Sequence, residues 1–103
     1  MPYRVIFSPE SAEQLRGLGD YIAFRSNSAT ARRSLGSIVE FCEGLGDMPH
    51  RGRARDDLRP GLRTLSFRGR VLIAYAVDSD SVTILAIFYA GQDFESLLAT
   101  PDR

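Results

Sequence analysis

The sequence predicts an α+β fold with two layers: an N-terminal strand, an antiparallel pair of helices, and a three-stranded antiparallel meander. Two neighbouring segments in the first half have apolar residues at three- and four-residue spacing, which is typical of helices. Three short runs rich in β-branched and aromatic residues, separated by small turns, fill the second half. The 103 residues suit one domain with a single core, so we treat residues 1–103 as one unit.

The first strand and the first helix are expected at the N-terminus. Residues 3–7, YRVIF, are of types that favour strands. Ser8-Pro9-Glu10 then supplies a capping serine, a first-turn proline and an acid, which together indicate a helix start. The helix is expected to end near residues 25–27. Its apolar stripe consists of Ala12, Leu15, Leu18 and Ile22.

A second helix is expected from about residue 29 to residue 45, with Ser28 as its N-cap. Gly44, Gly46 and Pro49 end it. Few residues separate the two helices, so they should form an antiparallel hairpin that packs on the sheet. The apolar face of this helix consists of Ala31, Leu35, Ile38, Val39, Cys42 and Leu45.

The sheet is expected to contain residues 62–67, 71–77 and 82–89, in that order. Arg68-Gly69 and the polar residues 78–81 form the turns between them, and the N-terminal strand joins the same sheet. A short helical turn is expected at residues 94–99.

The composition excludes several classes of protein. No apolar run approaches the roughly 20 residues that cross a bilayer, and the N-terminus lacks the pattern of a secretory signal. A single cysteine excludes an internal disulfide framework. We therefore expect a cytoplasmic protein with no membrane partner.

Positive charge is concentrated in one block, although the net formal charge of the chain is zero. All 13 basic residues are arginines, whose planar guanidinium groups bind carboxylates and phosphates in a bidentate way. The block contains Arg51, Arg53, Arg55, Arg59, Arg63, Arg68 and Arg70, against only Asp56 and Asp57. Such a block beside a small sheet predicts one basic surface that meets an anionic or carboxylate-bearing partner.

Most catalytic chemistry has no support in the sequence. Nucleotide-binding and nucleophile-elbow motifs are absent, and one histidine with one cysteine cannot form a usual zinc site, so we expect no cofactor and no metal. Cys42 falls on an apolar stripe and is expected in the core, while His50 is expected in an exposed loop. Arg63 alternates onto the side of Leu65 and Phe67, where a guanidinium needs a partner, whether structural or functional.

Several segments together resemble the RelE/ParE toxin superfamily, over about residues 3–93. They are Ser8-Pro9-Glu10, Leu15, Asp20-Tyr21-Ile22, Pro49, Gly52, Leu58-Arg59-Pro60-Gly61-Leu62-Arg63, Gly69-Arg70-Val71-Leu72-Ile73-Ala74-Tyr75, Ile84-Leu85 and Gly91-Gln92-Asp93. The resemblance implies the toxin of a type II toxin–antitoxin pair, neutralised by a small cognate antitoxin. It also implies one of two activities: ribosome-dependent mRNA cleavage in the RelE-like branch, or poisoning of DNA gyrase in the ParE-like branch.

Departures from the nuclease pattern favour the ParE-like branch. Gln92 and Leu98 stand where RelE-like nucleases carry an arginine and a tyrosine, and Tyr89 stands where many carry a histidine. A nuclease would have to use Arg63, Arg70 and Tyr89. The segments 58–63 and 69–75 look more like the ParE branch.

Three hypotheses follow: a gyrase inhibitor that acts by protein binding, the alternative of a ribosome-dependent mRNA endoribonuclease, and a stand-alone basic binding module. For the first, the residues expected to bind antitoxin or target are Arg51, Arg53, Arg59, Arg63, Arg70, Tyr75, Gln92 and Asp93. The antitoxin is expected to offer an acidic amphipathic segment to the helical hairpin or to a groove beside the sheet.

Overall fold

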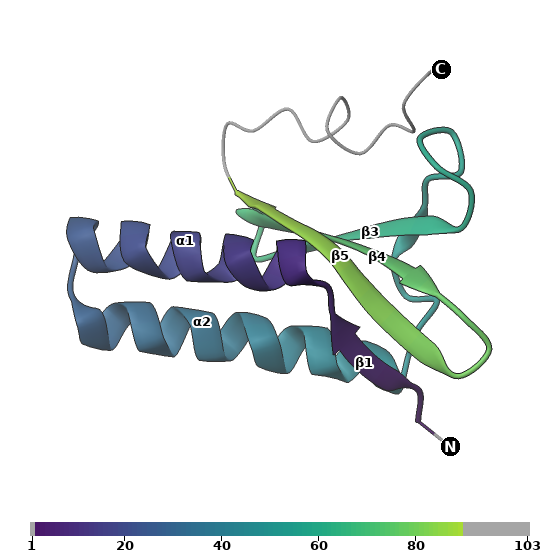
Figure 1. The fold of residues 1–103 in the computed structure, drawn as a ribbon, viewed down its shortest axis with the longest axis horizontal. Helices are drawn as coiled ribbons and strands as arrows, with labels where there is room; N and C mark the ends of the chain where they lie inside the picture. The colour runs from purple at the N-terminus through teal and green to yellow at the C-terminus, as the bar shows by residue number, and fades with distance from the viewer. Residues whose placement is uncertain (1, 90–103) are drawn as a thin grey trace.

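The computed structural model describes residues 2–89 and confirms the α+β class (Figure 1). Two helices lie side by side as a hairpin, and a curved sheet packs against one end of that pair. The elements in chain order are β1 (Arg4–Phe7), α1 (Pro9–Arg25), α2 (Ser28–Glu43), the short 3₁₀ helix η1 (Gly44–Gly46), β2 (Arg53–Ala54), β3 (Leu62–Phe67), β4 (Val71–Val77) and β5 (Ser81–Tyr89). The helical turn expected at 94–99 lies outside the described residues.

The sheet has five strands in the order β1-β5-β4-β3-β2. The predicted meander is present, because β3 pairs antiparallel with β4 and β4 pairs antiparallel with β5. The N-terminal strand joins it as predicted, in parallel with β5. Strand β2 was not predicted; two residues carry no readable alternation, and it pairs only as Arg53 with Thr64 and Ala54 with Arg63.

The helix ends show where capping decides the boundaries. Ser8 caps α1 as predicted, because its side chain accepts a hydrogen bond from the Ser11 N–H. The cap predicted for α2 is one residue off: Asn27 adopts the extended conformation and accepts from the Thr30 N–H at 2.7 Å. The α-helix ends at Glu43, and η1 continues the chain where the helix was expected to run to residue 45.

The core-facing side of α1 differs from the prediction at its first turn. Ala12 is exposed, and Ser11 is fully buried in its place. Burial of the serine is tolerated because its hydroxyl donates to the Ser8 carbonyl oxygen at 2.9 Å.

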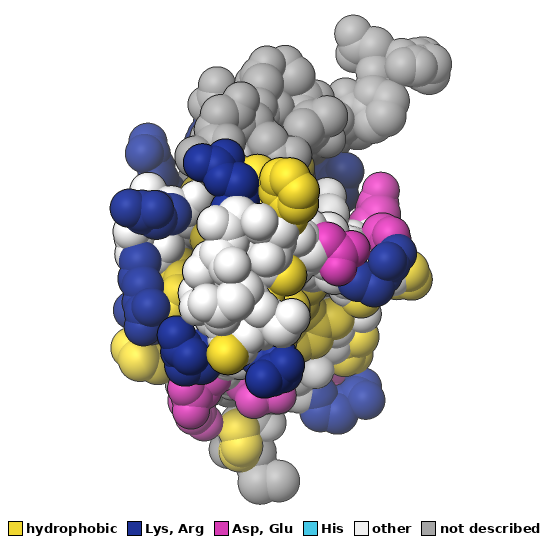
Figure 2. All heavy atoms as spheres, turned by 90° about the vertical axis from the view of Figure 1, so that its left-hand side faces the viewer, with side chains coloured by type: hydrophobic (Ala, Val, Ile, Leu, Met, Phe, Trp, Pro, Cys, Tyr) yellow, Lys and Arg dark blue, Asp and Glu magenta, His cyan; other side chains and the backbone are white. Residues whose placement is uncertain are grey.

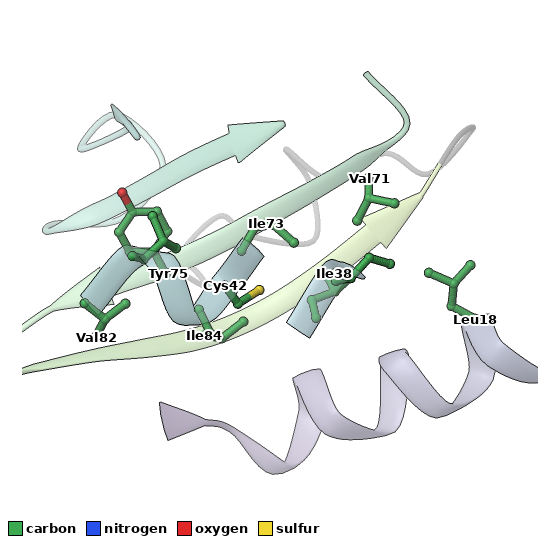
Figure 3. Close-up of a cluster of buried hydrophobic side chains, with 10 residues drawn as sticks. Leu18, Ile38, Cys42, Val71, Ile73, Tyr75, Val82 and Ile84 are labelled. Carbon is green, nitrogen blue, oxygen red and sulfur yellow. The ribbon is translucent and has the colours of Figure 1, made fainter. Parts of the chain in front are cut away.

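The main core lies between the helices and one face of the sheet (Figure 3). Leu18 of α1 and Ile38 and Cys42 of α2 face side chains of β4 and β5, among them Ile73 and Ile84. A smaller cluster occupies the opposite face, where Leu58 packs on buried residues of three strands. Those buried residues are Leu62, Ala74, Ala86 and Phe88.

Strand β5 contains a bulge that fixes how α1 docks. Ala74 pairs with Ala86 and Tyr75 pairs with Ile84, so Leu85 is an extra residue in the ladder. Beyond the end of β1, side chains of α1 replace a neighbouring strand: the Ser8 hydroxyl donates to the Leu85 carbonyl at 3.2 Å. The Gln14 Oε1 accepts from the Ile87 N–H at 2.7 Å.

Candidate protein-binding surfaces

The first candidate surface is the loop before β2, which side chains of β3 and β4 hold in place. Arg63 and Tyr75 are cross-strand neighbours on the helix-facing side of the sheet. The Arg63 Nη1 donates to the carbonyl oxygens of His50, at 3.2 Å, and Gly52, at 2.7 Å. The Tyr75 hydroxyl accepts from the Gly52 N–H at 2.8 Å. The partner that Arg63 requires on this apolar side is therefore loop backbone.

Tyr75 is a core residue that also accepts a hydrogen bond from the loop. Its side chain is fully buried in the main cluster, so it offers no surface to a partner protein in this structure. Burial raises the pKa of its hydroxyl, and the Gly52 N–H and the nearby Arg63 and Arg51 partly offset that rise. The hydroxyl is therefore neutral at physiological pH and serves as a hydrogen-bond acceptor.

Two arginines of this loop remain at the surface. The Arg51 guanidinium lies 5.1 Å from the centre of the Phe41 ring, and that ring packs against Phe67 at 4.8 Å. Arg53 is exposed on the edge strand β2. Arg53 lies beside Thr64 of β3, and Arg51 lies toward the Phe67 end of that strand. We call these two exposed arginines the basic loop.

The other arginines of the block lie at several places in the fold, and the single basic surface stays a prediction. Arg55 forms a two-pronged ion pair with Asp57, with both N···O distances 2.9 Å. Arg59 lines a small cleft with Ala86 and Phe88, which belong to the sheet face away from the helices. Arg70 lies beyond the Phe67 end of β3, in the turn to β4. Arg68 of the same turn lies over the Phe67 ring, which contacts Phe41 and so connects this turn to Arg51.

The second candidate surface is an apolar groove where the helical hairpin leaves the sheet. It has a volume of about 490 Å³ and is lined by Leu18, Tyr21, Ile22, Ser34, Ile38, Phe67, Arg68, Arg70, Val71 and Tyr89. The rings of Tyr21 and Tyr89 stack with centroids 5.8 Å apart, and Arg25 lies over the Tyr21 ring. We call this the hairpin groove; its two wall arginines, Arg68 and Arg70, come from the β3–β4 turn.

The outer end of the hairpin is also basic and partly apolar at its surface. Figure 2 looks onto this end and shows arginine side chains along one side, with apolar side chains exposed between them. Phe24 in the last turn of α1 is 87% exposed, far more than any other large apolar residue in the described part. A surface of this kind is typical of a protein-binding site.

The three residues that a nuclease would use do not meet at one point. Tyr89 and Arg70 lie at the hairpin groove, beside Val71, which pairs with Tyr89. Arg63 is four residues from the groove end of β3, roughly 13 Å along the strand, with its guanidinium on loop carbonyls. Gln92 and Asp93 lie outside the described residues.

Cys42 and His50 lie where the sequence predicts them. Cys42 is completely buried, and burial, helped by the charge of Glu43, raises the pKa of its thiol to about 12, so it is a core residue and not a nucleophile at neutral pH. His50 is exposed in its loop. Within residues 2–89 no cluster of potential metal ligands occurs, and no helix there is long and apolar enough to span a bilayer.

Sequence reasoning missed the helical contribution to the hairpin groove. Tyr21 and Arg25 are spaced i, i+4, and the Arg25 guanidinium donates to the Tyr21 hydroxyl at 3.1 Å. That spacing is readable in the sequence. Their position opposite Tyr89 depends on how far the hairpin extends past the sheet, which the sequence does not show.

Comparison with known proteins agrees with this architecture. A chain from a chromosomal ParDE toxin–antitoxin system of P. aeruginosa has a similar fold, with a TM-score of 0.75 and 22% sequence identity over 84% of this chain and 95% of that one. No curated protein shows significant sequence similarity to this chain. The family of ParE toxins of type II toxin–antitoxin (parDE) systems matches residues 5–94. The chain therefore belongs to the ParE toxin family.

Proposed function

We propose that this toxin inhibits DNA gyrase by binding it, and that a cognate antitoxin neutralises the toxin. The observation that carries the choice of mechanism is the separation of Arg63 from Arg70 and Tyr89. A ribonuclease centre needs its charge-stabilising arginine and its base around the same phosphate. Here the Arg63 guanidinium binds loop backbone, while Tyr89 stacks on Tyr21 in the hairpin groove, whose lining includes Arg70 but not Arg63. This arrangement favours recognition of a protein.

The hairpin groove supports an antitoxin with an acidic amphipathic helix. Its apolar walls suit leucine-like side chains, and Arg68 and Arg70 are placed to meet carboxylates. Arg70 forms no ion pair with any residue among 2–89. Its charge is therefore not neutralised by that part of the chain and can meet a carboxylate of the antitoxin. We assign the basic loop, which is polar and exposed, to binding of the target.

The decisive assay mixes purified toxin with gyrase and supercoiled or relaxed plasmid. We expect trapped DNA breaks or lost supercoiling, and we expect pre-incubation with the antitoxin to restore normal activity. Absence of any effect at several-fold molar excess over gyrase would refute the gyrase proposal. Primer extension on translated mRNA after induction of the toxin addresses the alternative, because cuts inside codons would identify a ribonuclease.

The groove assignment has its own measurement. The variants Arg70→Met and Arg16→Met each remove one exposed arginine, the first at the groove and the second on α1 beside Glu13. We expect Arg70→Met to weaken antitoxin binding by about two- to fivefold, as for a rim ion pair, and Arg16→Met to leave it unchanged. Equal affinities for both variants would place the antitoxin elsewhere.

A further inference from the structure

The backbone on both sides of Arg51 is held by side chains that come from the sheet. The peptide group before Arg51 offers the His50 carbonyl oxygen, which accepts from Arg63 at 3.2 Å. The peptide group after it offers the Gly52 N–H, which donates to Tyr75 at 2.8 Å. The next carbonyl, that of Gly52, accepts from the same Arg63 nitrogen at 2.7 Å. Three successive peptide groups are therefore fixed by two side chains.

The loop has little freedom to take another conformation. Gly52 is buried so tightly that a Cβ there would lie 2.6 Å from the Tyr75 hydroxyl and 2.8 Å from the Thr64 carbonyl oxygen. Tyr75 cannot yield, because its ring is fully buried in the main core. The Arg51 side chain is placed in turn by the Phe41 ring, 5.1 Å away.

The packing of β3 on the core does not by itself require an arginine at position 63. The neighbours of Arg63 along β3 on that side, Leu65 and Phe67, pack on the main core. A guanidinium in such a position is costly to desolvate and is kept only with partners, and an apolar residue would fill the space at lower cost. Within residues 2–89, the hydrogen-bond acceptors of Arg63 are the His50 and Gly52 carbonyl oxygens of the loop.

We infer that Arg63 and Tyr75 are positioning residues, which hold the basic loop so that Arg51 and Arg53 meet the target in a preset geometry. This inference rests on the proposal that the toxin acts by binding a protein. A loop ordered before binding loses less conformational entropy in the complex, and affinity rises accordingly. Arg63 therefore acts through Arg51 and Arg53, not by touching the target.

The test begins with the loop itself. Tyr75→Phe keeps the ring and removes the acceptor, and Arg63→Met keeps the stem and removes the donors. In both variants we expect amide hydrogen exchange at Gly52 to accelerate by about tenfold or more, with core amides such as Ile73 unchanged. Unchanged exchange at Gly52 would overturn the inference. Since Tyr75 is a core residue, Arg63→Met carries this test if Tyr75→Phe fails to fold.

The second step measures killing after induction of the toxin in cells, so it does not depend on the identity of the target. We expect Arg63→Met to reduce killing as strongly as the double variant R51A/R53A. Adding Arg63→Met to that double variant should cause no further loss of killing, because Arg63 would then have no arginine side chains to position. Arg63→Lys, which keeps a donor, should recover part of the activity, and Arg16→Met should kill like the wild type.

Full killing by Arg63→Met despite a loosened loop, or an additive loss in the triple variant, would overturn the positioning role. Failure of the gyrase proposal looks different: the wild type would kill cells while gyrase remained active, and the pattern among the loop variants would stand. A wild-type chain that does not kill would overturn both.

Discussion

The contact between Gln14 and the bulged strand β5 gives a quantitative test of how α1 is docked. The Ile87 N–H donates to the Gln14 Oε1 at 2.7 Å, and Ile87 is 1% exposed. Replacing Gln14 with methionine keeps the length of the side chain and removes the acceptor, so a buried N–H is left without a partner. The cost of such a group is about 1–3 kcal/mol. The methionine gains some apolar contact, and we expect a net loss of about 1–2 kcal/mol in the free energy of unfolding.

The loss is measurable by urea denaturation followed by far-UV circular dichroism, since the chain contains no tryptophan. For a domain of this size it corresponds to a decrease in Tm of about 4–16 °C. Gln14→Glu is the matched control, because a carboxylate oxygen can accept the same hydrogen bond. A Gln14→Met variant within about 0.5 kcal/mol of the wild type, the usual effect of a surface change, would refute the reasoning. So would a Gln14→Glu variant as unstable as Gln14→Met.

Three further predictions follow from buried groups and from glycines. Cys42 should resist alkylation in the native protein at pH 8, because burial raises its thiol pKa to about 12, and should react quickly in denaturant; stoichiometric native labelling would contradict this. Gly17→Ala should stabilise the protein by about 0.5–1 kcal/mol, since a Cβ in this exposed helical position meets nothing within 4 Å. Gly52→Ala should destabilise it, and thermal unfolding of the two variants should show shifts of opposite sign. The raised pKa of Tyr75 means that its contribution to stability is complete below about pH 10, its unfolded value, and is lost as pH rises through the higher folded value. The free energy of unfolding should therefore fall less steeply between pH 8 and pH 11 for Tyr75→Phe than for the wild type. Equal slopes for the two proteins would exclude the effect.

Local sequence patterns predicted the parts of the fold that local forces decide. Three- and four-residue spacing identified both helices, and β-branched runs identified β3, β4 and β5. The alternation in β3 placed Arg63 on the apolar side, and desolvation then required a partner there. The identity of that partner was not predictable, because His50 and Gly52 reach Arg63 only once β2 has paired with β3.

The missed features depend on contacts between distant segments. The first turn of α1 buries Ser11 instead of Ala12 because Ser8 and Gln14 bind the free edge of β5, a strand more than 70 residues away in sequence. The bulge at Leu85 leaves no mark on an apolar run in which nearly every position is hydrophobic. The hairpin groove exists because the two helices extend past the sheet, and their lengths relative to the strands decide its position.

The placement of the arginine block follows from the antiparallel pairing of β2 with β3. Because β2 runs against β3, the chain before β2 lies toward the Phe67 end of β3. The Arg51 guanidinium lies over the Phe41 ring, that ring contacts Phe67, and the Arg68 guanidinium lies over the Phe67 ring. Two arginines that are far apart in the sequence are therefore connected through a pair of aromatic rings. A charge count along the sequence detects the block but not this arrangement, because the arrangement depends on how β2 pairs with β3.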